Sequence, residues 1–192
     1  MEIFEVLEWI AVAMGIVYIF LLIQENIWCW FFGIVSSICF IFLMYNKQLY
    51  SESILYAFYV FIGFYGFYKW SQNDTEKVII KSASWTTILY IVVIGIICSY
   101  FVGTFFGQKT DAARPFADAT TSVFSVLASY MEAHKWLASW FFWIVINFFS
   151  IWLYFDRALN ISSMLMVIYF LLSIVGYMQW KKNMQNDLVV SS

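Results

Sequence analysis

The sequence predicts an all-α integral membrane protein, with seven transmembrane helices arranged as two parallel three-helix repeats joined by a single linking helix. Composition, seven apolar runs and an internal repeat support this prediction. Of the 192 residues, 64% are hydrophobic and 11% are charged, whereas a soluble domain has about 45–50% apolar and about 25% charged residues. A soluble fold of this length cannot bury so much apolar surface. The chain is therefore expected to lie in a lipid bilayer.

Seven apolar runs have the length of a membrane-spanning helix, which needs about 20 mostly apolar residues. They lie at approximately residues 5–24, 27–45, 50–70, 85–106, 115–134, 137–155 and 159–180. The first run follows an acidic start rather than the basic one of a secretory signal, so we expect a permanent span. Only the connection 71–84 is long and polar. So little chain outside the bilayer argues against a catalytic or nucleotide-binding domain, and we expect no enzyme.

An internal repeat sets the predicted architecture. Residues 25–70 match residues 135–180 without a gap, and 13 of the 46 positions are identical. The matches include the pairs Trp30/Trp140, Gly66/Gly176 and Trp70/Trp180. Each copy is three helices long, so the fourth run stands alone between the copies and makes them parallel. Parallel repeats are a known transporter design, in which the substrate binds near the midplane.

These boundaries divide the chain into four segments. We expect a first three-helix bundle at 1–70, a polar loop with the linking helix at 71–110, a second bundle at 111–182 and a short polar tail at 183–192. The loops on the side of the C-terminus hold more cations, namely Lys69, Lys77, Lys81, Lys135, Lys181 and Lys182 against Lys47, Lys109, Arg114 and Arg157. Cytoplasmic loops are richer in Lys and Arg, which predicts a cytoplasmic C-terminus. The net charge of -2 gives no basic footprint for a nucleic acid.

One face of the sixth run is the strongest candidate for a binding site. Trp140, Trp143 and Asn147 are spaced i, i+3 and i+7, which places them on one side of a helix. An amide in hydrocarbon is costly unless it is hydrogen-bonded, so Asn147 is expected to point inward. It can bind substrate, or it can simply join two helices while the tryptophans pack. The second run has a smaller counterpart of this face in Trp30 and Ser37.

The third run carries a second polar and aromatic stripe, made of Glu52, Tyr56 and Tyr59, and the last run answers it with Tyr169 and Ser173. Glu52 lies near a helix start, where an acid also suits the helix dipole without any role in binding. Aromatic faces attract cations by about 0.5–2 kcal/mol per contact. A cavity lined by aromatic rings with an acid therefore favours a small, flat, cationic solute.

Other motifs are absent from the sequence. No cluster with metal-ligand spacing, no nucleophile motif and no phosphate-binding loop is present. We therefore predict no metal and no cofactor, and transport that is passive or ion-coupled. A fifth run that opens at Pro115 carries the polar face Asp118, Thr121, Ser122, Ser125 and Ser129, which lines a pathway or packs against the sixth run.

Several segments resemble the PnuC-type vitamin transporters. They are Asn26 to Val35, Leu49 to Glu52, Tyr65 to Trp70, Pro115 to Thr121 and Trp140 to Asn147, and they occur in family order over most of the chain from the second run onward. The resemblance implies a fold of three, one and three helices related to the SWEET sugar transporters, and a trimer in a bacterial cytoplasmic membrane. It implies facilitated diffusion of an unphosphorylated vitamin, followed by trapping through phosphorylation. It also implies that Trp140, Trp143 and Asn147 line the substrate site.

Three positions depart from the family pattern. Ser37 replaces an Asn, Tyr56 replaces a Gln, and Ala138 replaces an acid. The first two lie on the proposed cavity face, so they bear on the substrate rather than on the fold. The resemblance implies nicotinamide riboside as the first expectation and thiamine as the alternative. Both are flat cations, so the aromatic residues do not separate them. A neutral sugar carrier and a receptor that binds without transport are the remaining alternatives.

Overall fold

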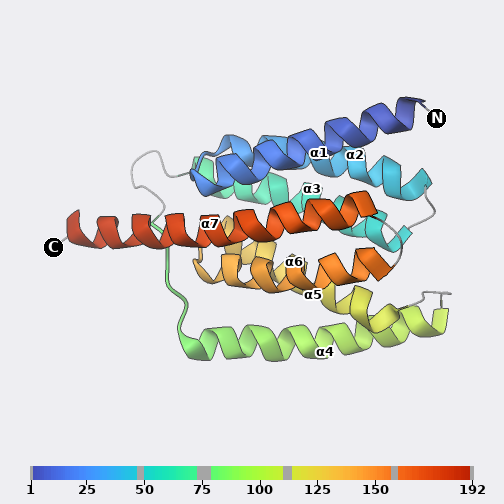
Figure 1. Ribbon diagram of the computed structural model, residues 1–192. Helices are drawn as coiled ribbons and strands as arrows, with labels where there is room; N and C mark the ends of the chain where they lie inside the picture. Colours follow the sequence, from blue (N-terminus) through green and yellow to red (C-terminus); the bar gives the residue numbers. More distant parts are fainter. Residues whose placement is uncertain (1, 47–49, 73–78, 110–113, 157–159, 191–192) are drawn as a thin grey trace. The chain divides into compact units, whose positions relative to one another are not determined.

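The computed structural model describes residues 2–46, 50–72, 79–109, 114–156 and 160–190. Within them the chain forms seven helices and no strand (Figure 1). The helices are α1 (Glu2–Ile23), α2 (Trp28–Asn46), α3 (Tyr50–Ser71), α4 (Trp85–Lys109), α5 (Pro115–Ala133), α6 (Ala138–Asp156) and α7 (Asn160–Val190). The all-helical fold and the number of helices are as predicted, and most bounds agree to within a few residues.

The largest difference is at the end of α7. The helix continues through residues 183–190, where the sequence analysis placed a tail. No proline or glycine interrupts residues 181–190, and Lys, Met and Gln are good helix formers. Residues 73–78, part of the expected polar loop 71–84, lie outside the described residues, as do Lys47, Lys77 and Arg157.

Four helical segments are long and apolar enough to cross a membrane by length and composition. They are Ile3–Ile23 in α1, Trp28–Asn46 in α2, Trp85–Lys109 in α4 and Ser163–Asp187 in α7. The described apolar part of α6, Ala138–Leu153, is shorter. The remaining helices, α3 and α5, are more polar, and α5 carries Asp118 in its first turn. The four apolar segments in α1, α2, α4 and α7 confirm that the chain is a membrane protein.

The chain divides into two compact units. The first consists of α1, α2 and α3 together with residues 133–135 and 178–192. The second holds residues 80–132 and 136–177, which include α4, α5, α6 and most of α7. The linking helix α4 thus groups with α5 and α6. The division into repeats at 70, 110 and 182 follows the sequence rather than these units, and it stays a prediction.

In the first unit, α1, α2 and α3 lie side by side (Figure 1). Ala11 packs with Cys39 and Leu43 in a buried cluster, and the hydroxyl of Ser36 donates a 2.8 Å hydrogen bond to the carbonyl of Ala11. The indole of Trp30 lies flat against α3, because a Cβ added at Gly66 would come within 2.4 Å of its ring. Glycine is therefore the residue that lets α2 and α3 meet here.

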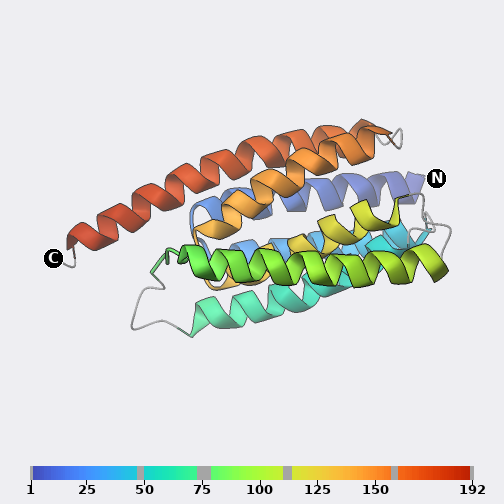
Figure 2. The ribbon, with the colours of Figure 1, turned by 90° about the horizontal axis from the view of Figure 1, so that it is seen from below.

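In the second unit, α4 lies along α5 (Figure 2). A Cβ at Gly95 would come within 2.6 Å of the Phe124 ring, and one at Gly103 within 2.6 Å of Phe116. Further along α5, Ala128 and Met131 form a buried core with Phe142 and Ile146 of α6. Small residues on α4 thus allow close helix packing, as is common in membranes.

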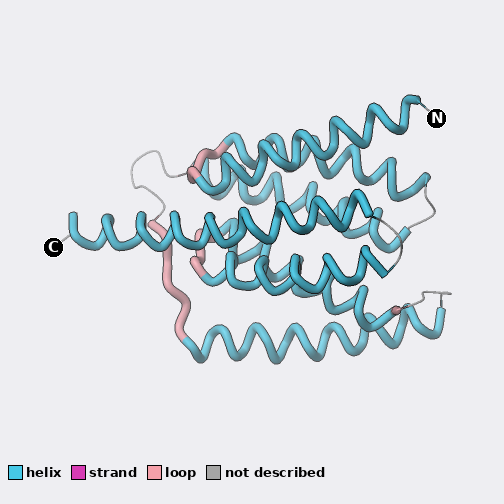
Figure 3. Tube along the Cα trace, in the orientation of Figure 1, coloured by secondary structure: helices cyan, strands magenta, loops and turns pink. Residues whose placement is uncertain are grey.

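An extended segment leads into α4 in the same unit (Figure 3). The carbonyl of Lys81 accepts a 2.9 Å hydrogen bond from the backbone N–H of Leu137, and Ile80 is buried. This contact ties the entry of α4 to the entry of α6. At the helix start, Ser84 caps α4 by accepting from the N–H of Thr87 at 3.2 Å.

The repeat seen in the sequence recurs in local structure. Glu25 and Lys135, at equivalent positions, both adopt positive φ, of 57° and 52°. The following residues close the same helix-ending bond, from Asn26 N–H to Leu21 O and from Trp136 N–H to Met131 O, both at 2.9 Å. This is the pattern of a Schellman motif. Further along, Ser53 and Ser163 donate to the carbonyls of Ile41 and Ile151, both at 3.1 Å.

The two equivalent turn residues bind each other. Lys135 Nζ lies 2.7 Å from Glu25 Oε2, and their side chains are 7% and 13% exposed. The ammonium group also lies 4.5 Å from the centroid of the Trp70 ring, and Asn183 donates to Glu25 Oε1 at 2.7 Å. Both charges of this buried pair therefore have further polar or aromatic partners, which such a pair needs to offset its desolvation.

Two tryptophans complete this cluster. Trp70, at the end of α3, donates its indole N–H to the carbonyl of Ala133 at 3.0 Å. Trp180, its equivalent on α7, donates to the carbonyl of Leu22 at 3.1 Å. Each indole thus satisfies a carbonyl in the last turn of a helix, where intrahelical partners are missing.

Gly66→Ala and Gly176→Ala are each expected to destabilise the protein by about 1–3 kcal/mol, the usual range for overpacking. The added methyl group would overlap a buried indole ring in either case. Thermal melting of the purified protein in detergent measures the effect. Gly107→Ala is the control, since Gly107 is exposed near the end of α4 and the nearest atom to an added Cβ would be on Pro115, 3.2 Å away. Equal melting temperatures for all three variants would contradict the packing argument.

Lys135→Met is expected to lower the free energy of unfolding by about 3–5 kcal/mol, because it leaves the Glu25 carboxylate buried without its cation. The double variant Glu25→Gln with Lys135→Met removes both charges and is expected to recover part of the loss. Denaturation in detergent of the two single variants and the double variant gives the coupling energy. A double variant no more stable than Lys135→Met would show that the charges do not interact.

Candidate functional site

The face predicted on the sixth run forms one side of α6. Trp140 is fully buried, and its ring lies against α7, where a Cβ at Gly176 would come within 2.4 Å of it. This is the same contact that Trp30 makes with Gly66. Trp140 is therefore held rigidly by the backbone of α7.

Asn147 lies two turns further along α6 and is 4% exposed. Its Nδ2 donates a 3.1 Å hydrogen bond to the hydroxyl of Ser173 on α7. Ser173 in turn donates to the carbonyl of Tyr169 at 2.7 Å. The expectation that Asn147 points into the protein is met, and a chain of hydrogen bonds connects three of the polar positions on α6 and α7.

Trp143 stands between Trp140 and Asn147 on the same face. Its ring is half-buried and packs against the core formed by Ala128, Met131, Phe142 and Ile146. Its indole nitrogen is buried, yet among the described residues it has no hydrogen-bond acceptor. An indole N–H is a donor only, and a buried donor without a partner costs free energy. The site therefore offers one N–H that a ligand can satisfy.

The predicted residues of α2 and α3 gather in the first unit. Trp30 and Ser37 are buried, at 2% and 7% exposure. Trp30 meets the edge of Trp70 with ring centroids 5.5 Å apart. On α3, Tyr56 stacks on Phe40 at 4.7 Å with the rings 17° from parallel, and Tyr59 meets its edge at 5.7 Å.

Glu52 is half-buried in the first turn of α3, as the sequence indicates. The structure thus brings the predicted residues together in two sets. Trp140, Trp143, Asn147 and Tyr169 lie in the second unit, and Trp30, Ser37, Glu52, Tyr56 and Tyr59 lie in the first.

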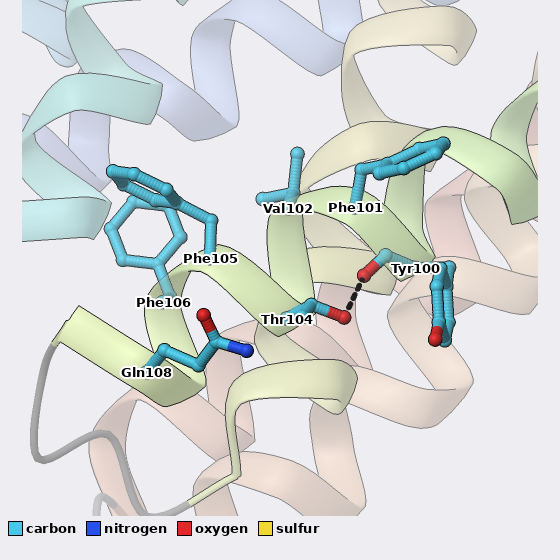
Figure 4. A pocket seen from close by; sticks show the side chains of 7 residues that line it. All are labelled: Tyr100, Phe101, Val102, Thr104, Phe105, Phe106 and Gln108. Carbon is cyan, nitrogen blue, oxygen red and sulfur yellow. Dashed lines mark hydrogen bonds between the residues drawn. The ribbon is translucent and has the colours of Figure 1, made fainter.

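A hollow on the outer face of α4 differs from these sets. Figure 4 shows its lining residues, all from one helix: Tyr100, Phe101, Val102, Thr104, Phe105, Phe106 and Gln108. The hydroxyl of Thr104 already donates to the carbonyl of Tyr100 at 2.8 Å. Tyr100, Phe101 and Phe105 are more than half exposed, and such an apolar surface suits contact with lipid.

Ser173 is the residue of this site to which the sequence analysis gave no role of its own. It is 1% exposed and contacts both Asn147 and Tyr169. Its spacing of four residues from Tyr169 correctly placed it on the same helix face as Tyr169. Its pairing with α6 could not be read from the sequence, because it depends on how α6 and α7 pack.

Comparisons with known proteins identify chains that are similar over most of this sequence. A family model described as "Nicotinamide mononucleotide transporter" matches residues 5–182. The "Nicotinamide riboside transporter PnuC" of Escherichia coli is 25% identical over 203 residues, covering 91% of this chain and 84% of the relative. That of Neisseria mucosa is 26% identical over 190 residues, covering 90% and 71%.

Two further similarities extend this result. The "Riboflavin/roseoflavin transporter RibM" of Streptomyces davaonensis is 21% identical over 179 residues, covering 91% of this chain and 84% of the relative. The crystal structure of a protein titled "Vitamin B3 transporter PnuC" matches with a TM-score of 0.78 and 24% identity, covering 94% of this chain and 82% of that one. At this identity the structural match shows the fold, which is that of the vitamin transporter.

Proposed function

We propose, for a chain that belongs to the nicotinamide mononucleotide transporter family, that it carries nicotinamide riboside across the membrane by facilitated diffusion. As a member of this family the protein is a membrane transporter rather than an enzyme. Release of the substrate on the cytoplasmic side would be followed by phosphorylation, which traps the vitamin in the cell.

The face formed by Trp140, Trp143 and Asn147 carries this proposal. We assign Trp143, whose ring is half-buried, and Trp140, which is buried in this structure, to stacking on a pyridinium cation, an attraction of about 0.5–2 kcal/mol per contact. The amide of Asn147 and the indole N–H of Trp143 add polar groups at fixed positions. A largely apolar pocket with a few placed polar groups is the usual form of a site for a small molecule.

The remaining residues predicted from the sequence are proposed for substrate binding as well. We assign Trp30, Tyr56 and Tyr59 to aromatic contact, Ser37 to hydrogen bonding and Glu52 to offsetting the positive charge of the substrate. Tyr169, on α7, is assigned to aromatic contact as well. We also propose a bacterial cytoplasmic membrane as the location, a cytoplasmic C-terminus and a trimer, as the resemblance and the loop charges imply.

Riboflavin is the second candidate substrate. The RibM relative named for it covers most of the chain, and a flavin ring also stacks on aromatic side chains. Ser37 and Tyr56, the two residues of the proposed cavity face that differ from the family pattern, are the positions expected to determine such a change in substrate. Thiamine remains an alternative on charge and shape alone.

Calorimetric titration of the purified protein separates these substrates. Nicotinamide riboside is expected to bind saturably, while thiamine, riboflavin and a neutral sugar are expected to bind at least about tenfold more weakly, because each lacks part of the match in charge or hydrogen bonding. Uptake into proteoliposomes then distinguishes a carrier from a receptor. Tight riboflavin binding with no response to nicotinamide riboside would replace the proposed substrate and keep the transporter.

Asn147→Leu is expected to weaken binding of nicotinamide riboside by at least about tenfold, the usual effect of losing a buried hydrogen bond. Leucine has a similar size and keeps the helix, so the melting temperature in detergent should change much less than the affinity. Ser53→Ala is the control, since it removes a hydrogen bond to a helix carbonyl outside the proposed site. Unchanged affinity in the folded Asn147→Leu variant would move the site elsewhere.

A further inference from the structure

The hydrogen bonds around Ser173 fix which atom of Asn147 is available to a ligand. A serine hydroxyl has one proton, and Ser173 gives it to the carbonyl of Tyr169, 2.7 Å away on its own helix. With its proton given there, it accepts from Asn147. The amide must therefore place its NH2 group against Ser173, which is the observed contact of 3.1 Å. The carbonyl oxygen of Asn147 is then the group that accepts a hydrogen bond from a ligand.

Burial makes this orientation persistent. Ser173 is 1% exposed and Asn147 is 4% exposed, so water has little access to either group. In the observed orientation the Ser173 hydroxyl takes part in two hydrogen bonds. With the amide reversed it could form only one, because its single proton would go either to Asn147 Oδ1 or to the carbonyl of Tyr169. The observed orientation is thus favoured by one buried hydrogen bond.

One turn earlier on α6, Trp143 supplies the opposite kind of group. Its buried indole N–H has no acceptor among the described residues, and Trp143 shares a helix face with Asn147. The face therefore presents one fixed donor and one fixed acceptor. A primary carboxamide matches this pair, because its C=O accepts and its NH2 donates.

We propose that Ser173 is a positioning residue that makes the site select a ring carrying a neutral carboxamide over the same ring carrying a carboxylate. A carboxylate has only acceptor atoms, so one of its oxygens would face the carbonyl oxygen of Asn147. This inference rests on the proposed function, and it adds the chemical group by which the substrate is recognised.

The repeat supports a role in recognition rather than in folding. The hydroxyl bonds of Ser53 and Ser163 occur in both copies at equivalent positions, as expected for contacts that the fold itself needs. The equivalents of Asn147 and Ser173 are Ser37 and Gly63, which cannot form the same pair. The helices of the first copy pack without such a hydrogen bond. Packing alone therefore does not require the Asn147–Ser173 pair, which favours a role in recognition.

Titration of the purified protein with nicotinamide riboside and with nicotinic acid riboside tests the proposal. The two ligands differ only in the carboxamide and the carboxylate. The unsubstituted protein is expected to prefer the amide by at least about tenfold. In Ser173→Ala the Asn147 amide can reverse, and the preference is expected to fall to about threefold or less. Ser173→Thr keeps a hydroxyl at the same place and is expected to retain it.

Ser163→Ala is the matched control, since Ser163 also lies on α7 and its hydroxyl donates to a backbone carbonyl, that of Ile151 on α6. It should leave the ratio of the two affinities unchanged, whereas a general loosening of α7 would alter all affinities together. Ser173→Cys, of similar volume, serves as a second variant in case Ser173→Ala does not fold.

Each outcome bears on the proposal in a distinct way. A lost preference in folded Ser173→Ala or Ser173→Cys, with the preference intact in Ser163→Ala, supports it. Equal binding of both ligands by the unsubstituted protein, or an unchanged ratio in folded Ser173→Ala and Ser173→Cys, overturns it and leaves the proposed function standing. Binding of neither ligand overturns the proposed function, and the inference with it.

Discussion

The structure depends on the need of buried polar groups for partners within the protein. Hydrocarbon offers none, so the few polar side chains of this apolar chain determine which helices contact each other. Ser36 joins α2 to α1, Ser53 joins α3 to α2, and Ser163 joins α7 to α6, each by donating to a backbone carbonyl. The same requirement gives the buried Lys135 a carboxylate and an aromatic ring as partners.

Tryptophan serves two purposes in this chain. Trp30 and Trp140 pack flat on helices where glycine leaves room for a ring, while Trp70 and Trp180 donate to carbonyls at helix ends. Indole combines a large apolar surface with one donor, so it can fill a helix interface and satisfy a backbone group together. Trp143 fills its interface but keeps its donor without an acceptor among the described residues. This donor lies on the helix face of the candidate site.

The two copies of the repeat share their backbone contacts and differ in their chemistry. The turns at Glu25 and Lys135 have the same geometry and opposite charges, which lets equivalent positions attract each other. Asn147 and Ser173 have no counterpart pair in the first copy, where Ser37 and Gly63 stand. The two copies keep the same packing and differ in a few side chains. One three-helix arrangement therefore supplies the structural contacts in both copies and a polar recognition face in the second.

The sequence alone determined the membrane setting, the number and approximate bounds of the helices, the repeat and the face of α6 that carries Trp140, Trp143 and Asn147. These features are local, because helix length, helix periodicity and a fixed offset are written along the chain. The extension of α7 to Val190 was missed, since a polar stretch can be tail or helix until its neighbours are known. Only the tertiary structure decided that Glu25 binds Lys135, that Trp180 reaches Leu22 and that Ser173 holds Asn147. Each of these contacts joins residues on different helices, and their partners follow from packing rather than from spacing.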